Sequence, residues 1–257
     1  MTRPDFVQSL ERGLAVIRAF DAAHPELTLS EVAAATSVTR AAARRFLLTL
    51  AELGYVRSDG RLFSLTPKVL ELGYAYLSSL SLPDVAEPHL EALAADVNES
   101  SSISVLDRDD VVYVARVPVS RIMTVTISVG TRFPAYATSM GRVLLAGLSP
   151  EQLEEYLSRI KLQRLTSRTV SSVASLRAEL TRVRTQGWAI VNQELEEGLR
   201  AVAAPIRDRR DRVIAAVNIS TQASRTSLDT MRRELLPPLL ATVKRIESDL
   251  RPPPPRG

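Results

Sequence analysis

The first third of the chain alternates amphipathic segments with polar breaks, and this pattern predicts three helices in succession. Apolar residues recur at helical spacing from Ser9 to Phe20 and again from Thr39 to Leu53. Between these segments, Thr28-Leu29-Ser30-Glu31 fits a capping box that begins a short helix. The stretch from Thr36 to Thr39 is rich in hydroxyl side chains, which favour a turn between the second and third helices.

After Gly54 the spacing of apolar residues changes from helical to alternating. Tyr55–Arg57 and Leu62–Leu65 are β-type runs, and Asp59-Gly60 between them is a signal for a two-residue hairpin turn. Helices in this order followed by a hairpin are typical of a winged helix-turn-helix. The second helix of the helix-turn-helix motif enters the DNA major groove. The segment from Thr28 to Lys68 therefore predicts a domain that binds double-stranded operator DNA.

Basic residues gather in this segment. From Thr39 to Lys68 the bases outnumber the acids by four, which equals the net charge of +4 of the whole chain. Such a local excess is what a phosphate-binding surface requires, although an ordinary α+β domain with solvated arginines is an alternative. The candidate DNA-contacting residues are Thr28, Ser37, Thr39, Arg40, Ala41, Arg44, Arg45, Arg57 and Arg61.

The rest of the chain predicts a linker helix and a larger α+β domain. Thr66-Pro67 begins a helix that extends to about Leu80 and is broken at Ser81-Leu82-Pro83; a core helix of the first domain is the alternative. Further helices are expected at 85–97, 137–148, from 149 onward, 176–186 and 227–250, the last kinked by Pro237-Pro238. Strands are expected at 101–119 with a turn at 107–110, and at 122–129, 188–191, 201–206 and 213–220.

The expected fold class is therefore α+β. It comprises an N-terminal winged helix-turn-helix (1–66), a linker helix (67–82) and a C-terminal domain (83–250) with a mostly antiparallel sheet flanked by helices. A proline-rich tail (251–257) is expected to be disordered.

Composition narrows the class of protein. The 257 residues hold no cysteine, which excludes disulfides and thiolate metal sites and agrees with a reducing compartment. The N-terminus lacks the apolar core of a signal peptide, and no stretch approaches the length of a membrane span. We therefore expect a cytoplasmic protein with no membrane partner. The sequence pI of about 9.7 is consistent with nucleic-acid binding.

Catalytic signals are weak. The two histidines, His24 and His89, are isolated, and neither a phosphate-binding loop nor a nucleophile elbow occurs. We expect no enzymatic activity, no cofactor and no metal site. Two alternatives stay open: a small-molecule enzyme on residues 85–250 joined to a nucleic-acid module, and a DNA-architectural protein that needs no ligand.

A candidate ligand site begins at Tyr136, just after Pro134. A helix that starts there offers free backbone amides to an anion, Thr138 and Ser139 add hydroxyls, and Gly141 permits close approach. The alternative is that one of the hydroxyls merely caps its own helix. A small carboxylate is the expected ligand, and the candidate residues are Tyr136, Ala137, Thr138, Ser139, Met140 and Gly141.

The chain also resembles a known family. The segments SLERGLAVIRAF, TLSEVAAATSVTRAAARRFLLTLAELGYV, FPAYATSMGRVLLAGLSPEQLEEYL and GWAIVNQELEEGLRAVAAPIRDRRDRVIAAVNIS resemble the IclR family of bacterial transcriptional regulators over nearly the whole length. The resemblance is greatest to the subgroup that controls the β-ketoadipate route of aromatic-acid breakdown. It implies a GAF-like effector-binding domain after the linker, and dimers or tetramers.

The resemblance further implies that the loop from Asn192 to Arg200 and the following strand line the effector pocket. On that basis the candidate effector-binding residues also include Asn192, Gln193, Glu194, Ala201, Val202 and Ala203. A solvated acidic loop is the alternative. Glu194 would have to be protonated, paired with Arg200 or turned away from an anionic effector.

The expected function is that of a ligand-responsive regulator of aromatic-acid catabolism genes, whose effector is a small organic or aromatic carboxylate. An IclR-type regulator of another carboxylate or sugar-acid pathway is the alternative.

Overall fold

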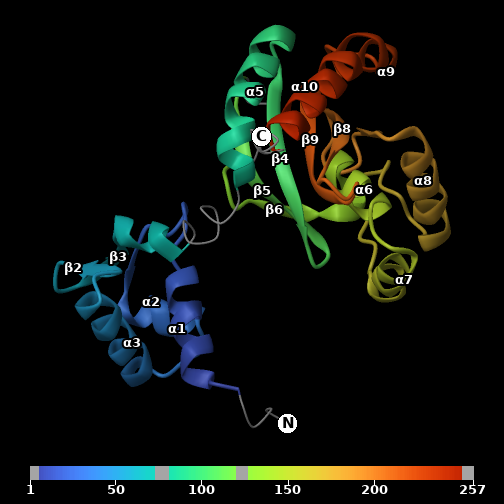
Figure 1. Ribbon diagram of the computed structural model, residues 1–257. Coiled ribbons are helices and arrows are strands. Elements are labelled where there is room, and N and C mark those ends of the chain that lie inside the picture. Colours follow the sequence, from blue (N-terminus) through green and yellow to red (C-terminus); the bar gives the residue numbers. More distant parts are fainter. Residues whose placement is uncertain (1–5, 73–80, 120–126, 251–257) are drawn as a thin grey trace, which may run out of the picture. The chain divides into compact units, whose positions relative to one another are not determined.

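The computed structural model describes residues 6–72, 81–119 and 127–250. The chain divides into two compact units, Met1–Ser79 and Leu80–Gly257 (Figure 1). The division falls inside the segment that the sequence predicts as a linker. Each unit has its own hydrophobic core.

The smaller unit contains the predicted helices and hairpin in the predicted order. Its elements are α1 (Gln8–Arg18), β1 (Glu26–Thr28), α2 (Leu29–Ala35), α3 (Arg40–Glu52), β2 (Val56–Ser58) and β3 (Leu62–Leu65). The capping box is confirmed, because the Glu31 carboxylate accepts from the Thr28 N–H at 2.7 Å and the Thr28 hydroxyl accepts from the Glu31 N–H at 3.4 Å. The core forms where Val16, Val32 and Leu47 meet, all fully buried.

Two details of the hairpin differ from the prediction. The short strand β1 pairs with β3 and makes a three-stranded sheet, which the sequence did not predict. The turn is also shifted by one residue, because the Asp59 N–H donates to the Leu62 carbonyl at 3.2 Å. Gly60 (φ +101°) and Arg61 are therefore its central residues, rather than Asp59-Gly60. The Asp59 carboxylate instead accepts from the backbone of Arg61 at 2.9 Å.

The start of the predicted linker helix is present. Thr66 caps a turn at Pro67–Val69 that continues as helix to residue 72, and residues 73–80 lie outside the described part. The predicted break at Ser81-Leu82-Pro83 is wrong, since these residues belong to α5 (Ser81–Val97). A proline near the described start of a helix is tolerated because the N–H groups there lack intrahelical partners.

The larger unit is built on one antiparallel sheet. Among the described residues six strands pair in the order β6-β5-β4-β9-β8-β7. Their bounds are β4 (Ser100–Asp107), β5 (Asp110–Val117), β6 (Arg132–Pro134), β7 (Ala189–Asn192), β8 (Leu199–Arg207) and β9 (Val213–Gln222). Most of the strand predicted at 122–129 lies outside the described residues, and its described end, 127–129, is not a strand.

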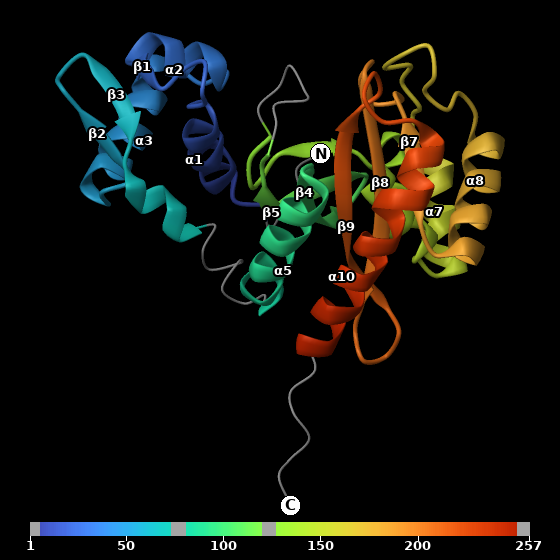
Figure 2. The same ribbon diagram turned by 90° about the horizontal axis from the view of Figure 1, so that it is seen from above.

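Helices cover both faces of this sheet (Figures 1 and 2). α5 and α10 (Leu236–Asp249) lie on one face, and α6 (Ser139–Ala146) and α8 (Val173–Gln186) lie on the other, with α7 (Pro150–Arg159) beyond them. The last helix is irregular before its two prolines but is not split: α9 (Leu228–Thr230) and a π-helical turn (Met231–Leu235) continue without a break into α10, whose first turn holds both prolines. The tail at 251–257 lies outside the described residues.

α6 is the centre of the second core, because every one of its residues is buried. It follows a single 3-10 turn (Ala135–Ala137), and the two pack so closely that a Cβ on Gly141 would lie 2.1 Å from the Ala135 carbonyl oxygen. The sequence predicts that a glycine at 141 lets a ligand approach the backbone. In the structure the atoms that approach Gly141 are instead backbone atoms of Ala135.

We predict that Gly141→Ala destabilises the larger unit by about 3 kcal/mol, at the upper end of the usual cost of overpacking, because the neighbouring backbone cannot yield. Gly13→Ala is the matched control: the added Cβ would lie 3.9 Å from its nearest neighbour, inside α1. Alanine should raise helix stability there by roughly 0.5–1 kcal/mol. Thermal unfolding of both variants tests this, and equal melting of Gly141→Ala and wild type would contradict it.

Candidate DNA-binding surface and effector cavity

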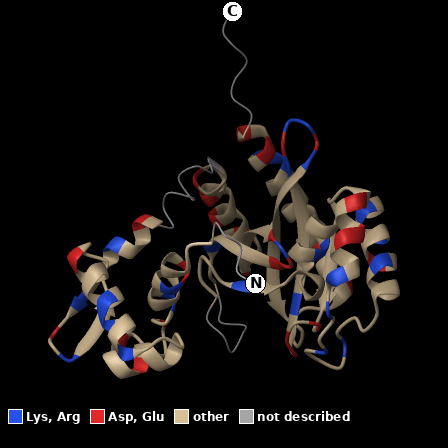
Figure 3. Cartoon of the chain, turned by 90° about the horizontal axis from the view of Figure 1, so that it is seen from below, with Lys and Arg blue, Asp and Glu red and all other residues tan. Residues whose placement is uncertain are grey.

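α3 presents its basic residues to solvent. Ala43, Leu47 and Leu50 form its buried side, and Thr39 caps its start by accepting from the Ala42 N–H at 3.2 Å. The exposed residues at its N-terminal end are Ala41 and three arginines: Arg40, Arg44 and Arg45. In Figure 3 the positions of lysine and arginine, in blue, lie on the helices and the hairpin of this unit.

The remaining candidate DNA contacts fall into two groups. Arg61 is exposed at the turn of the hairpin, whereas the Arg57 Nε donates to the Ser64 hydroxyl at 3.0 Å and is held along the strands. The hydroxyl of Thr28 is engaged in the capping box, and Ser37 has φ +54° in the turn between α2 and α3. Geometry thus leaves Arg40, Arg44, Arg45 and Arg61 as freely exposed cations.

A cavity lies between the sheet of the larger unit and the start of α6. The described residues that line it are Tyr113, Ile127, Ala137, Thr138, Ser139, Val191, Leu195, Leu199, Ala201, Asn218 and Ser220. This lining brings together four residues that the sequence analysis selected: Ala137, Thr138, Ser139 and Ala201.

The other candidates lie elsewhere. The Tyr136 hydroxyl bonds to the backbone of Gln163, donating at 3.1 Å and accepting at 3.0 Å. Met140 accepts from the Ser104 hydroxyl at 3.2 Å. Ala203 is buried in the core beneath α6. Val202, its neighbour along the strand, projects from the opposite face of the sheet.

The hydroxyls at the start of α6 have different surroundings. Thr138 accepts from the Gly141 N–H at 2.9 Å, so it caps its own helix, as the alternative interpretation held. Ser139 Oγ is buried without a hydrogen-bond partner among the described residues, and so is Asn218 Oδ1. Leaving a buried polar atom unpaired costs about 1–3 kcal/mol. Two such atoms in the wall of one cavity indicate a place where a ligand supplies the missing bonds.

A cation lies on the same face of the sheet as Asn218, two strands away. In the sheet Ser102 pairs with Asn218 on one side and with Arg116 on the other, so all three side chains share one face. The Arg116 Nη1 donates to the Ser102 hydroxyl at 3.1 Å, which places the guanidinium over the central strand of the three. No carboxylate of a described residue lies within 4.0 Å of it, and burial lowers its pKa below the usual value.

Arg116, Asn218 and Tyr113 are not predicted from the sequence. Their signal is a polar residue inside a strongly apolar strand, as in VVYVARV and VIAAVNIS. Burial raises the pKa of Tyr113 to about 12, so its hydroxyl keeps its proton at neutral pH and is able to donate a hydrogen bond.

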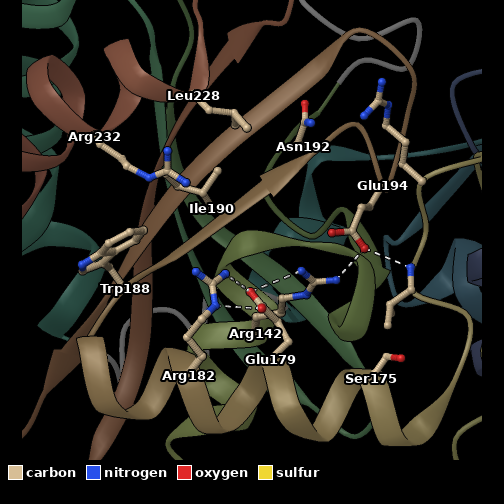
Figure 4. A pocket seen from close by; sticks show the side chains of 12 residues that line it. Arg142, Ser175, Glu179, Arg182, Trp188, Ile190, Asn192, Glu194, Leu228 and Arg232 are labelled. Atoms are coloured by element: carbon tan, nitrogen blue, oxygen red, sulfur yellow. Dashed lines mark hydrogen bonds and ion pairs between the residues drawn. The ribbon is translucent and has the colours of Figure 1, made fainter.

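Glu194 points away from this cavity. Its carboxylate accepts from the Arg142 Nη2 at 2.5 Å and from the Val170 N–H at 3.0 Å, and both charged side chains are largely buried (Figure 4). Of the three possibilities left open by the sequence, pairing with Arg200 is wrong. Arg200 instead donates to the Asn192 side chain at 2.7 Å. Gln193 makes a bond of its own, accepting from the Gly198 N–H at 2.9 Å.

Comparisons with known proteins show the family to which the chain belongs. Residues 9–60 match the IclR helix-turn-helix domain, and residues 74–248 match the C-terminal domain of the bacterial transcriptional regulator IclR. The chain therefore belongs to the IclR family of bacterial transcriptional regulators. Among the described residues no helix is long and apolar enough to cross a membrane.

Individual relatives narrow the comparison. The Pca regulon regulatory protein of Pseudomonas putida is 48% identical over 93% of this chain and 82% of its own length. The p-hydroxybenzoate hydroxylase transcriptional activator of Acinetobacter baylyi is 36% identical over 95% of this chain and 92% of its own length. An IclR homologue from Microbacterium hydrocarbonoxydans, solved in complex with 4-hydroxybenzoate, has a TM-score of 0.84 and 26% identity and covers 95% of this chain and 99% of that one.

We predict that Glu194→Gln lowers the free energy of unfolding by about 3 kcal/mol, because it leaves the buried Arg142 without its nearest counter-charge. Glu154→Gln is the matched control, since Glu154 forms an exposed pair with Arg177 whose loss should leave the free energy of unfolding nearly unchanged. Urea unfolding measures both values. Equal, small losses would show that the buried pair contributes no more than a surface one.

Proposed function

We propose that the protein regulates genes of aromatic-acid catabolism by binding operator DNA through α3 and the hairpin and a small aromatic carboxylate in the effector cavity. Three relatives or neighbours support this, because their names refer to the Pca regulon, to p-hydroxybenzoate hydroxylase and to bound 4-hydroxybenzoate. It acts by binding rather than by turnover, at DNA in the bacterial cytoplasm.

The observation that carries the proposal is the juxtaposition of unpaired polar groups in the effector cavity. Ser139 and Asn218 offer hydrogen bonds that no described residue completes, and the Arg116 guanidinium, which bonds to Ser102 on the same face of the sheet, would attract a carboxylate. Val191 and Leu199 supply an apolar wall for a ring. A benzoate with one polar substituent has this combination of one charge, one apolar body and a second hydrogen-bonding end.

The N-terminal unit would act as a dimer. Leu10 and Leu14 lie one turn apart on α1 and are 63% and 49% exposed, so an apolar stripe of the helix faces solvent in the single chain. A second copy that covers this stripe would present two α3 helices to one operator. A monomer in sedimentation equilibrium would contradict this part of the proposal.

For DNA binding we predict different consequences of two arginine substitutions. Arg44→Ala should weaken operator binding by about 1–3 kcal/mol and relax the base preference at one position, because α3 residues contact base edges. Arg61→Ala should weaken all sequences about equally and reduce the salt dependence, because the hairpin contacts phosphates. Gel shifts on operator and random DNA at two salt concentrations separate the two roles, and identical behaviour of the variants would show that they are wrongly assigned.

For the effector we predict that Arg116→Met weakens binding of 4-hydroxybenzoate by roughly 10- to 100-fold, the range expected for a hydrogen bond to a charged group. Binding of the uncharged 4-hydroxybenzamide should be unchanged. The unliganded variant should melt no lower than wild type, because a half-buried charge with no described counter-ion is removed.

Calorimetry on the full-length protein measures these affinities, with Arg209→Met, at an exposed turn, as the control. Equal losses for the acid and the amide would place the carboxylate elsewhere. Absence of binding by 4-hydroxybenzoate or protocatechuate, with binding of a sugar acid, would instead favour regulation of a sugar-acid pathway.

A further inference from the structure

A second cleft lies behind the wall of the effector cavity. It runs between the free edge of β7 and α8, with a volume of about 810 Å³, its open mouth included (Figure 4). Trp188, Ile190 and Asn192 line it as alternate residues, so their side chains share one face of the strand. Val191 turns to the other face and lines the effector cavity. One strand thus separates two distinct sites.

The charges in this cleft do not balance. Two carboxylates line it together with four guanidinium groups, those of Arg142, Arg168, Arg182 and Arg232. Both carboxylates are already engaged: Glu194 with Arg142 at 2.5 Å, and Glu179 with Arg182 at 2.7 Å. In the described part of the chain, no carboxylate lies within 4.0 Å of Arg168 or of Arg232. The cleft therefore keeps two positive charges that its own acids do not neutralise.

Apolar surface lies between these charges. Figure 4 shows Trp188 and Ile190 beside Arg232, with the side chain of Leu228 close by. Trp188 is half-buried, so one side of its indole ring remains accessible. Arg232 projects from the π-helical turn before α10, a type of irregularity that is frequent at functional sites. The wall offers contact area for a short hydrocarbon segment.

We propose that this cleft binds a small organic dicarboxylate. Two guanidinium groups without acidic partners match two carboxylates, because each planar guanidinium forms paired hydrogen bonds with one carboxylate. The methylene groups between the carboxylates would lie against Trp188 and Ile190. The site is separate from the effector cavity and does not depend on the function proposed for that cavity.

Trp188 provides a direct readout, because it is the only tryptophan of the chain. Adipate does not absorb where indole does, so it is titrated into the full-length protein at constant ionic strength while tryptophan fluorescence is followed. We expect a saturable change in wild type. Arg168→Ala and Arg232→Ala should each raise the Kd of adipate by about tenfold or more, as the loss of a charged hydrogen bond implies.

Two control variants make the result specific. Arg209→Ala removes an exposed arginine from the turn between β8 and β9, and it should leave the Kd of adipate unchanged. Asn218→Ala alters the effector cavity and should also leave it unchanged, while binding of 4-hydroxybenzoate, measured by calorimetry, persists in Arg232→Ala. Absence of a saturable fluorescence change in wild type overturns the proposal. An increase in the Kd of adipate in Arg209→Ala equal to that in Arg232→Ala also overturns it. An increase in this Kd in Asn218→Ala alone would assign adipate to the effector cavity and would overturn the proposal as well.

Discussion

The larger unit depends on burying α6 completely against the sheet. This short helix carries an arginine, and Arg142 is only 4% exposed, so its charge has to be neutralised inside the protein. Glu194 and Glu179 do this from the loop after β7 and from α8. The same guanidinium also donates through Nε to the Tyr136 carbonyl at 3.1 Å. One buried side chain therefore ties together the start of α6, the edge of the sheet and the outer helix.

This buried network determines what lies on each side of β7. On the inner side it fixes the turn that presents Ser139 to the effector cavity, where the unpaired groups are neutral and Arg116 lies on the same face of the sheet. On the outer side it uses both carboxylates of the second cleft and leaves Arg168 and Arg232 without acidic partners among the described residues. An inner site with neutral hydrogen-bonding groups suits a ring with one charge, and an outer site with excess cations suits a dianion.

Local signals in the sequence predicted most elements, because caps and apolar spacing act over a few residues. The start of α7 near residue 149 is an example, and so is the turn at 107–110 between β4 and β5. β1 was missed because a three-residue strand has no pattern of its own and exists by pairing with β3. For the site, the start of α6 was predicted from its own residues. Asn218 and Arg116 share one face of the sheet only when three strands pair. Arg142 and Glu194 are 52 residues apart in the sequence. No local sequence pattern predicts either arrangement.

The central claim is that a ligand bound in the effector cavity changes the affinity of the N-terminal unit for DNA. Thermodynamic linkage makes this testable in both directions, since an effector that changes the DNA affinity by some factor must have its own affinity changed by DNA by the same factor. The direct measurement is the Kd of a labelled promoter fragment with and without saturating 4-hydroxybenzoate, set beside the Kd of 4-hydroxybenzoate with and without that fragment. We expect two equal factors different from one in wild type, and no coupling at the same ligand concentration in Arg116→Met. Tight binding of both ligands with no mutual effect would contradict the claim.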